Sequence, residues 1–349
     1  MEKNKNFINI IKVACVYTGL IFGAGFASGQ EHLTFFLRYG GKWGILGIIL
    51  AGAVIALCGW AVLDICVKNN IKDYRGFMQV VFGKRLGMVL DIITGLFIFV
   101  IFAAMLAGAG ALGVQALNFN FTSGTFILAA LCFIVLLFDV RGIVEINTII
   151  TPILIVGALG LGIFAILNAA ETTAATTAFA QTAIWPLSAL VYSSYNMITA
   201  IAVLTTMPAI VTNKQIARAG GLLGGFFIIL VGVVFAFALL TNLPAVQSAE
   251  LPMLALAQTL APTIAHAYTI LLFLAIFTTA ATNAFALTNW LASRTRFTKM
   301  QIKIAITALA IATAHLGFSG IVSSAYTIFG FLGLFIIITI LLNFLTKRN

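Results

Sequence analysis

Residues 17–36 read YTGLIFGAGFASGQEHLTFF, and this stretch decides how the rest of the chain is interpreted. Its flanks are apolar enough to enter a bilayer. Its middle is rich in glycine and runs directly into polar side chains: Gly19, Gly23, Gly25, Gly29, Gln30, Glu31 and His32. A helix in lipid must satisfy its own backbone hydrogen bonds, so a weakened and polar segment at this depth requires a specific physical reason.

The composition of the whole chain indicates a polytopic membrane protein. Of the 349 residues, 62% are hydrophobic and only 8% are charged, and the mean hydropathy is +1.14. Soluble proteins carry about 25% charged residues. The fold class that we predict is therefore all-α and membrane-spanning.

About ten segments have the roughly 20 apolar residues that a membrane span requires. We predict one transmembrane domain, 1–349, with spans at 9–37, 43–67, 88–117, 122–138, 142–168, 183–207, 220–242, 263–291, 301–316 and 320–345.

The basic residues indicate how these spans are oriented. With the N-terminus inside, 17 of the 19 lysines and arginines fall in inside segments, and only Arg38 and Lys42 fall outside. This asymmetry is typical of cytoplasmic loops, so we predict that both termini are cytoplasmic. The net charge of +10 is then a topology signal, and no nucleic-acid partner is expected because no clustered basic patch remains for it.

Three connections between spans are more than simple turns, and one of them is an Ala/Thr-rich outer loop at 169–182. Residues 68–87 mix basic and aromatic side chains, which predicts a short helix on the cytoplasmic membrane surface. Residues 243–262 carry Pro244, Pro252 and Pro262 around an apolar stretch, which suggests a short outer helix or lid.

The first span is predicted to be broken. Glycines lower the cost of leaving helical geometry, and irregular backbone at membrane depth is tolerated only where protein covers it or a wet cavity adjoins it. Close packing of helices through small residues is the alternative explanation. Close packing does not explain why the polar residues Ser28, Gln30 and Glu31 occur at this depth. We therefore favour a broken span that lines a cavity.

The sixth span, WPLSALVYSSYNMITAIAVL at 185–204, is predicted to contain a second break. Its middle holds a polar cluster of five residues: Tyr192, Ser193, Ser194, Tyr195 and Asn196. Serines can bond back to their own helix. Four hydroxyls and an amide in a row are costly in lipid, however, which favours a break at this point.

The two spans that are predicted to be broken occupy the same position in the two halves of the chain, because each is the first span of its half, about 9–168 and 183–345. Five spans in each half make the second half enter from the opposite face, which is the layout of an inverted repeat. Two broken helices that cross near the midplane can bind a carboxylate at their N-terminal ends and a cation at their freed carbonyls.

Polar residues in two further spans are candidates for the same site. Residues 276–290 read IFTTAATNAFALTNW, in which Thr278, Thr279, Thr282 and Asn283 share one side of a helix. We leave open whether Thr282 and Asn283 line the site or only bond between helices. The same question stays open for three residues of the tenth span: Ser323, Ser324 and Tyr326.

The nonamer GAGFASGQE at 23–31 resembles the YkvI family of bacterial membrane proteins, and the likeness covers nearly the whole chain. Through that family the chain is similar to the amino acid–polyamine–organocation superfamily. This resemblance implies the LeuT-type fold of two inverted five-span repeats and a location in the bacterial cytoplasmic membrane. After Gly25 the chain departs from the neurotransmitter-transporter pattern, because Gln30 and Glu31 replace an Asn-Phe-x-Arg-Phe-Pro stretch.

The resemblance also implies roles for individual residues. Its sodium-coupled members place an ion between the first-span break and the eighth span, which implies ligands from the carbonyls of Gly19 and Phe22 and the hydroxyls of Thr278 and Thr279. Oxygen donors suit such a hard cation. The implied substrate contacts are Gly23, Ala24, Gly25, Phe26, Tyr192, Ser193, Ser194, Tyr195 and Asn196, to which we add Ser28.

Glu31 is the strongest single candidate for a functional residue, because burying a carboxylate at membrane depth costs free energy and such residues are usually functional. It is a candidate proton carrier, unless the span is shallow there and Glu31 faces outer water. Some proton-coupled relatives carry a lysine in the fifth span. The fifth span here, 142–168, has none, which favours sodium as the coupling ion. No cofactor is expected beyond the sodium ion or proton.

We predict a secondary active transporter, acting as a symporter for a small solute such as an amino acid or related carboxylated or zwitterionic compound. A channel or a non-transporting sensor on the same scaffold is an alternative. A membrane enzyme is disfavoured because the H-E-x-x-H, G-x-S-x-G and P-loop motifs are absent. The sequence leaves the substrate, the direction of transport and the oligomeric state open.

Overall fold

The computed structural model describes residues 2–137, 143–169, 184–208 and 210–346, and no strand occurs in these ranges. The elements along the chain are α1 (Glu2–Ile21), α2 (Ala24–Ser28), α3 (Gln30–Phe35), η1 (Leu37–Tyr39), α4 (Gly41–Lys68), α5 (Tyr74–Leu117), α6 (Phe121–Leu137), α7 (Ile143–Leu167), α8 (Trp185–Leu204), α9 (Lys214–Leu240), α10 (Leu243–Val246), α11 (Pro252–Leu260), α12 (Pro262–Ala292), α13 (Lys299–Ala314), α14 (Phe318–Ile321), η3 (Val322–Tyr326) and α15 (Thr327–Thr346). The all-α fold class predicted from composition is confirmed.

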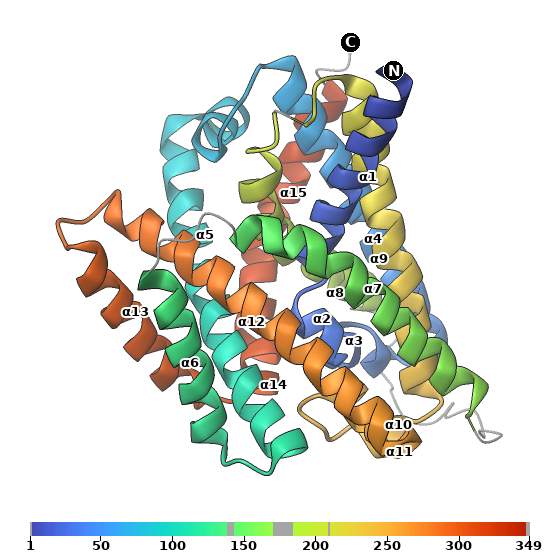
Figure 1. Cartoon of the computed structure of the whole chain (residues 1–349). Helices are drawn as coiled ribbons and strands as arrows, with labels where there is room; N and C mark the ends of the chain where they lie inside the picture. The colour runs from blue at the N-terminus through green and yellow to red at the C-terminus, as the bar shows by residue number, and fades with distance from the viewer. Residues whose placement is uncertain (1, 138–142, 170–183, 209, 347–349) are drawn as a thin grey trace.

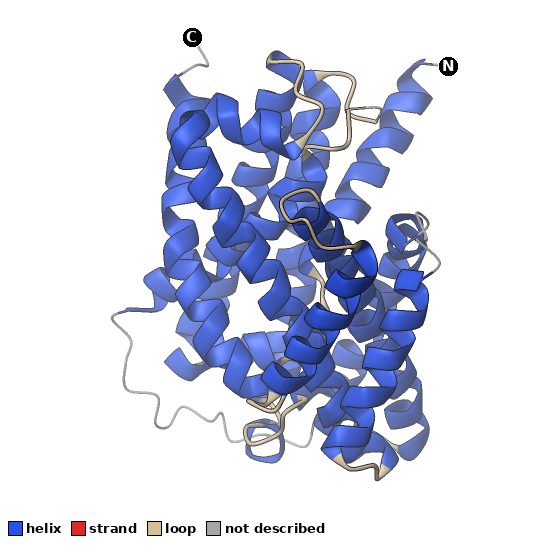
Figure 2. Ribbon diagram, turned by 90° about the vertical axis from the view of Figure 1, so that its left-hand side faces the viewer, coloured by secondary structure: helices blue, strands red, loops and turns tan. Residues whose placement is uncertain are grey.

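Each predicted span coincides with one helix or with a row of short helices. Within the described ranges, seven helical segments are long and apolar enough to cross a membrane, and the apolar helices 6–21 and 121–137 are shorter. Many large apolar side chains on the outer surface are exposed, such as Val156 and Ile270. Such a surface is expected where lipid rather than water surrounds the helices. The start of α1 and the end of α15 lie at the same end of the molecule (Figures 1 and 2).

The helices pack into two groups. In one group α4 packs along α8 and α9, and α1 packs along α9 and α8. In the other, α5 packs along α6, α12 and α13, which also pack on one another. Helices α7 and α15 bridge the groups, because α7 contacts α1, α9 and α12, while α15 contacts α4, α5 and α8.

This grouping matches the order of the predicted spans. Spans one, two, six and seven form the first group, and spans three, four, eight and nine form the second. Equivalent positions of the two predicted five-span halves therefore fall in the same group, as expected for two repeats. The inverted relation between the halves stays a prediction.

The first span is broken, as predicted. Helix α1 ends at Ile21, Gly23 has extended backbone (φ −78°, ψ −175°), and Gly29 separates α2 from α3 in the left-handed region (φ 82°). The Gly23 N–H donates to the Ile21 carbonyl at 2.8 Å, so the Gly19 carbonyl loses the partner that a continuous helix would supply. The 20-residue helix α1 and the short helices α2 and α3 thus replace one continuous span.

The short helix α11 covers this break from the end opposite the termini (Figure 1). It packs on α2, α7, α9 and α12, and the three prolines predicted to mark an outer helix, Pro244, Pro252 and Pro262, stand at the starts of α10, α11 and α12. On the neighbouring α12, the Tyr268 hydroxyl donates to the Ala27 carbonyl. Protein therefore surrounds the irregular backbone, as the low polarity of a bilayer requires.

Gly29 is the residue at which this arrangement is most sensitive to substitution. A Cβ at Gly29 would lie 2.9 Å from Met253 Cγ and 3.3 Å from the Met253 backbone nitrogen, and the left-handed backbone adds about 1–2 kcal/mol for a non-glycine residue. We expect Gly29→Ala to lower the melting temperature of the detergent-purified protein by several degrees. Gly160→Ala is the control, because a Cβ there meets no atom within 4 Å. Equal melting temperatures for the two variants would contradict this description of the break.

Candidate functional site

A cavity of about 110 Å³ lies beside the break in the first span. Its lining comes from the break, α3, α5, α8, α12 and η3, so both helix groups contribute. The lining residues are Leu20, Ile21, Gly23, Ala24, Gly25, Glu31, Phe97, Ile98, Ile101, Met105, Tyr195, Asn196, Thr199, Ala202, Val203, Thr279, Thr282, Asn283, Ala286 and Tyr326. The volume is small and suits a ligand of a few non-hydrogen atoms or several waters.

Glu31 is the only ionisable carboxyl on this lining. Its side chain is 4% exposed, and its Oε2 accepts no hydrogen bond. Neither of the two ion pairs within the described chain involves it. A buried carboxylate without a cation is costly, so the carboxyl needs a proton or a bound cation. The prediction that Glu31 faces outer water is therefore not the arrangement found here.

Gly25 makes room for this carboxyl. A Cβ added at Gly25 would lie 2.1 Å from Glu31 Oε1, which is far inside van der Waals contact. The break therefore serves two purposes, since it frees backbone groups and lets the Glu31 side chain approach α2 closely.

Tyrosine side chains surround the carboxyl. The hydroxyls of Tyr192 and Tyr195 lie close to the Glu31 carboxyl, but neither makes a hydrogen bond of good geometry. The Tyr195 ring packs against Tyr326 at 5.1 Å and against Phe97 at 5.9 Å between centroids. Buried polar atoms without partners are rare in proteins and need an explanation such as an absent ligand or water.

The break predicted in the sixth span is wrong, because α8 is continuous from Trp185 to Leu204. Its polar side chains bond back to carbonyls one turn earlier. Ser193 Oγ donates to Ala189 O at 2.8 Å, and Asn196 Nδ2 donates to Tyr192 O at 3.0 Å. Bonding of this kind satisfies serine and asparagine without unwinding the helix.

The two serines of that cluster serve packing rather than the cavity. Ser193 Oγ also lies 3.1 Å from Ala51 O on α4, and Ser194 Oγ donates to Gly330 O on α15. Of the five predicted residues of α8, Tyr195 and Asn196 line the cavity, while Tyr192 lies just behind it, near Glu31.

Within the first span, only some of the predicted substrate contacts line the cavity. Gly23, Ala24 and Gly25 line the cavity, whereas Phe26 packs among Phe22, His32 and Phe235. Ser28 Oγ lies 2.9 Å from Gly25 O and 3.2 Å from the Gln30 amide nitrogen, so it stabilises the turn between α2 and α3.

The predicted ion ligands are only partly brought together. Thr279 lines the cavity, and a Cβ at Gly23 would lie 3.7 Å from its Oγ1. Thr278 Oγ1 instead donates to Leu274 O at 2.8 Å. The predicted backbone ligands, the carbonyls of Gly19 and Phe22, lie at the break, where the Gly23 N–H donates to Ile21 O in place of Gly19 O. The sodium site stays a prediction, with Thr279 as its best-placed hydroxyl.

The residues whose role the sequence leaves undecided fall into two groups, those that line the cavity and those that do not. Thr282, Asn283 and Tyr326 line the cavity, whereas the hydroxyls of Ser323 and Ser324 bond to Gly320 O on the exposed side of the tenth span. Tyr326 ends the π-helical turn η3, and such turns are frequent at functional sites.

Phe97 and Thr199 line the cavity and were not predicted. Phe97 lies within a continuously apolar span and carries no sequence signal of a site. Thr199 was within reach of sequence reasoning, because it lies three residues after Asn196 on the same helical face.

Comparisons with known proteins agree with this architecture. The chain is 28% identical over 334 residues to the uncharacterized membrane protein YkvI of Bacillus subtilis (strain 168), covering 96% of this chain and 95% of that protein. It is 25% identical over 326 residues to YyaD of the same organism, with coverages of 93% and 94%. No family model matches the chain.

Solved structures show the same fold at low identity. A manganese transporter of Eremococcus coleocola superposes with a TM-score of 0.63 at 15% identity, covering 95% of this chain and 78% of that chain. MhsT in complex with L-phenylalanine gives 0.62 at 17% identity, with coverages of 94% and 87%. Mhp1, a nucleobase-cation-symport-1 family transporter, gives 0.52 at 12% identity, with coverages of 87% and 70%.

The chain is a multi-pass membrane protein with the LeuT-type fold. The predicted resemblance to YkvI is confirmed over nearly its whole length.

The contact between the break and α12 can be tested by cross-linking. In a variant without the four native cysteines, we expect Gly23→Cys and Thr279→Cys to form a disulfide under mild oxidation, because a Cβ at Gly23 lies 3.7 Å from Thr279 Oγ1. Mass spectrometry of linked peptides is the measurement. The control pairs Gly23→Cys with Thr278→Cys, whose side chain points about 100° away on the same helix. Equal cross-linking of both pairs would show that the break does not face Thr279.

Proposed function

We propose that the protein is a secondary active transporter of a small solute and works by alternating access. The observation that carries this proposal is the cavity between the two helix groups, where the buried Glu31 carboxyl has no ion-pair partner among the described residues and lies beside broken backbone. In transporters with repeats of this kind, the site lies near the midplane at discontinuous helices, and one group of helices rocks against the other. A bacterial cytoplasmic membrane and cytoplasmic termini belong to the same proposal.

A small amino acid is the solute that best matches the lining, because the cavity of about 110 Å³ has room for only a few non-hydrogen atoms. The Glu31 carboxyl is placed to receive an ammonium group, and the rings of Tyr195, Tyr326 and Phe97 add faces that attract a cation. The backbone of Gly23, Ala24 and Gly25 is available for a substrate carboxylate. The L-phenylalanine bound by MhsT supports this solute class.

A manganese ion suits the lining less well. The described residues contain no group of three or more His, Cys, Asp or Glu side chains that could hold a metal, and the cavity offers one carboxyl. Manganese prefers several carboxylate and carbonyl oxygens. The likeness to the manganese transporter therefore supports the fold and not that cargo.

Two coupling ions are consistent with the geometry. Sodium would take the Thr279 hydroxyl and carbonyls freed at the break. A proton would neutralise Glu31 when no cation is bound, since a buried carboxylate without a partner is costly. We favour sodium and retain the proton-coupled carrier as the second candidate, because Glu31 is buried and unpaired.

Gly25→Leu tests the proposal in reconstituted vesicles. The larger side chain displaces the Glu31 carboxyl and fills the cavity, so we expect saturable amino acid uptake to fall at least 100-fold, while insertion into the membrane is unchanged. Gly160→Leu is the control, because that position has open space around it. Normal uptake by Gly25→Leu would refute the assigned site. Currents proportional to voltage in the wild-type protein would indicate a channel instead.

A further inference from the structure

A second cavity, of about 420 Å³, lies between the start of α5 and the connection from α12 to α13. The start of α5 is at the end of the molecule that carries the start of α1 (Figure 1). This cavity shares no lining residue with the cavity around Glu31. The proposed function does not use it.

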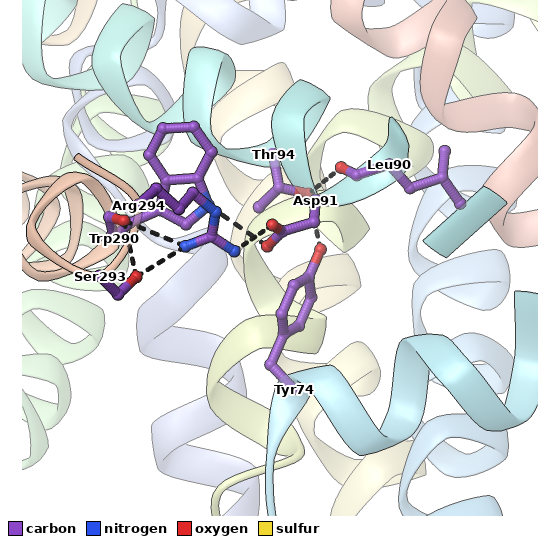
Figure 3. A network of polar contacts seen from close by, with 7 residues as sticks. All are labelled: Tyr74, Leu90, Asp91, Thr94, Trp290, Ser293 and Arg294. Atoms are coloured by element: carbon purple, nitrogen blue, oxygen red, sulfur yellow. Dashed lines mark hydrogen bonds and ion pairs between the residues drawn. The ribbon is translucent and has the colours of Figure 1, made fainter. Parts of the chain in front are cut away.

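A sharp turn inside α5 builds this cavity. Gly83 has a left-handed backbone (φ 73°, ψ 172°), so the segment 74–82 folds back against the rest of the helix. A Cβ at Gly87 would lie 3.2 Å from Met78 O, and the Tyr74 hydroxyl lies 2.8 Å from Thr94 Oγ1 (Figure 3). The fold-back places Arg75 and Lys84, from opposite sides of the turn, on one cavity wall.

The cavity has an excess of positive charge. Arg75, Lys84 and Arg294 face one acidic side chain, Asp91, which leaves a balance of two positive charges. Figure 3 shows Arg294 directed at Asp91, with the Trp290 indole donating to the same carboxylate at 3.2 Å. Arg294 is therefore already paired. Arg75 and Lys84 form no hydrogen bond or ion pair with any residue that the structure describes, and both are exposed.

The other wall of the cavity is apolar and faces outward. Met88 is 59% exposed and Ile92 is 47% exposed, and both lie on the membrane-spanning part of α5. Large apolar side chains on the outside of a membrane span contact lipid tails. The cavity thus joins two free cations at one rim to an apolar surface that continues into the bilayer.

We propose that this cavity binds an anionic phospholipid, with its phosphate on Arg75 and Lys84 and an acyl chain along Met88 and Ile92. Basic pockets between spans on the cytoplasmic side suit acidic lipid headgroups. A free phosphate has the same anionic chemistry but gains nothing from the apolar wall. The joint presence of both walls therefore favours the lipid.

The test is a thermal-stability titration of the purified wild-type protein with phosphatidylglycerol or phosphatidylcholine in mixed micelles. Inorganic phosphate forms a third arm. A ligand that binds the folded state raises the melting temperature with the logarithm of its concentration once that concentration exceeds its dissociation constant. We expect phosphatidylglycerol to raise it in this way, and phosphatidylcholine and inorganic phosphate to leave it unchanged.

The decisive variant is Arg75→Gln with Lys84→Gln. Each basic residue near an anionic lipid contributes about fivefold in affinity, so we expect about 30-fold weaker binding of phosphatidylglycerol by the double variant. The matched control is Lys72→Gln with Arg85→Gln, which removes the same charge from the same segment but not from the cavity. The control should bind phosphatidylglycerol like the wild type.

Three results would overturn the proposal. Equal loss of phosphatidylglycerol binding in both double variants would show a general charge effect. Equal stabilisation by phosphatidylcholine would show that the anionic headgroup is not recognised. Stabilisation by inorganic phosphate matching that by phosphatidylglycerol would show a site for free phosphate. If the decisive variant fails to fold, Arg75→Gln and Lys84→Gln measured singly, each with an expected fivefold loss, replace it.

Discussion

The structure depends on one physical constraint, which is that backbone groups inside a membrane must be hydrogen-bonded or covered by protein. The chain breaks its first span at Gly23 and Gly29 and then covers the break with α11 and α12. A helix interrupted at this depth exposes groups that lipid cannot satisfy. The interruption is therefore stable only because other helices and a small cavity surround it, and that same cavity is the candidate site.

The requirement for a polar partner inside the membrane applies to the Glu31 carboxyl as well as to the backbone. It is buried without a cation beside two tyrosine hydroxyls that also lack partners. The absence of a Cβ at Gly25 lets it reach this position. A natural sequence keeps such a cluster where a ligand or a proton completes it. Because both helix groups line the cavity, a ligand bound there would contact both groups, as the proposed alternating-access mechanism requires.

The sequence was sufficient for the features that arise from strong local signals. Ten apolar segments predicted the helices, and glycines followed by Glu31 predicted the broken span. The polar cluster at 192–196 was misread because the sequence does not show whether a serine bonds to its own helix or needs another partner. Ser193 and Asn196 do the former. The same limit applies to Thr278, while Phe97 reaches the cavity through tertiary packing that no local pattern encodes.

The most direct test of the account is the melting temperature of the purified protein against a panel of amino acids, each in sodium and in choline buffer. The account predicts that at least one amino acid raises the melting temperature, with the larger shift in sodium, and that Glu31→Gln abolishes the shift. A ligand at 100 times its dissociation constant adds about 2.7 kcal/mol of stability, which is easily measured. Glu250→Gln is the control, since that carboxyl binds Ser319 away from the cavity. A panel without any shift in either buffer, or an unchanged shift in Glu31→Gln, would contradict the account.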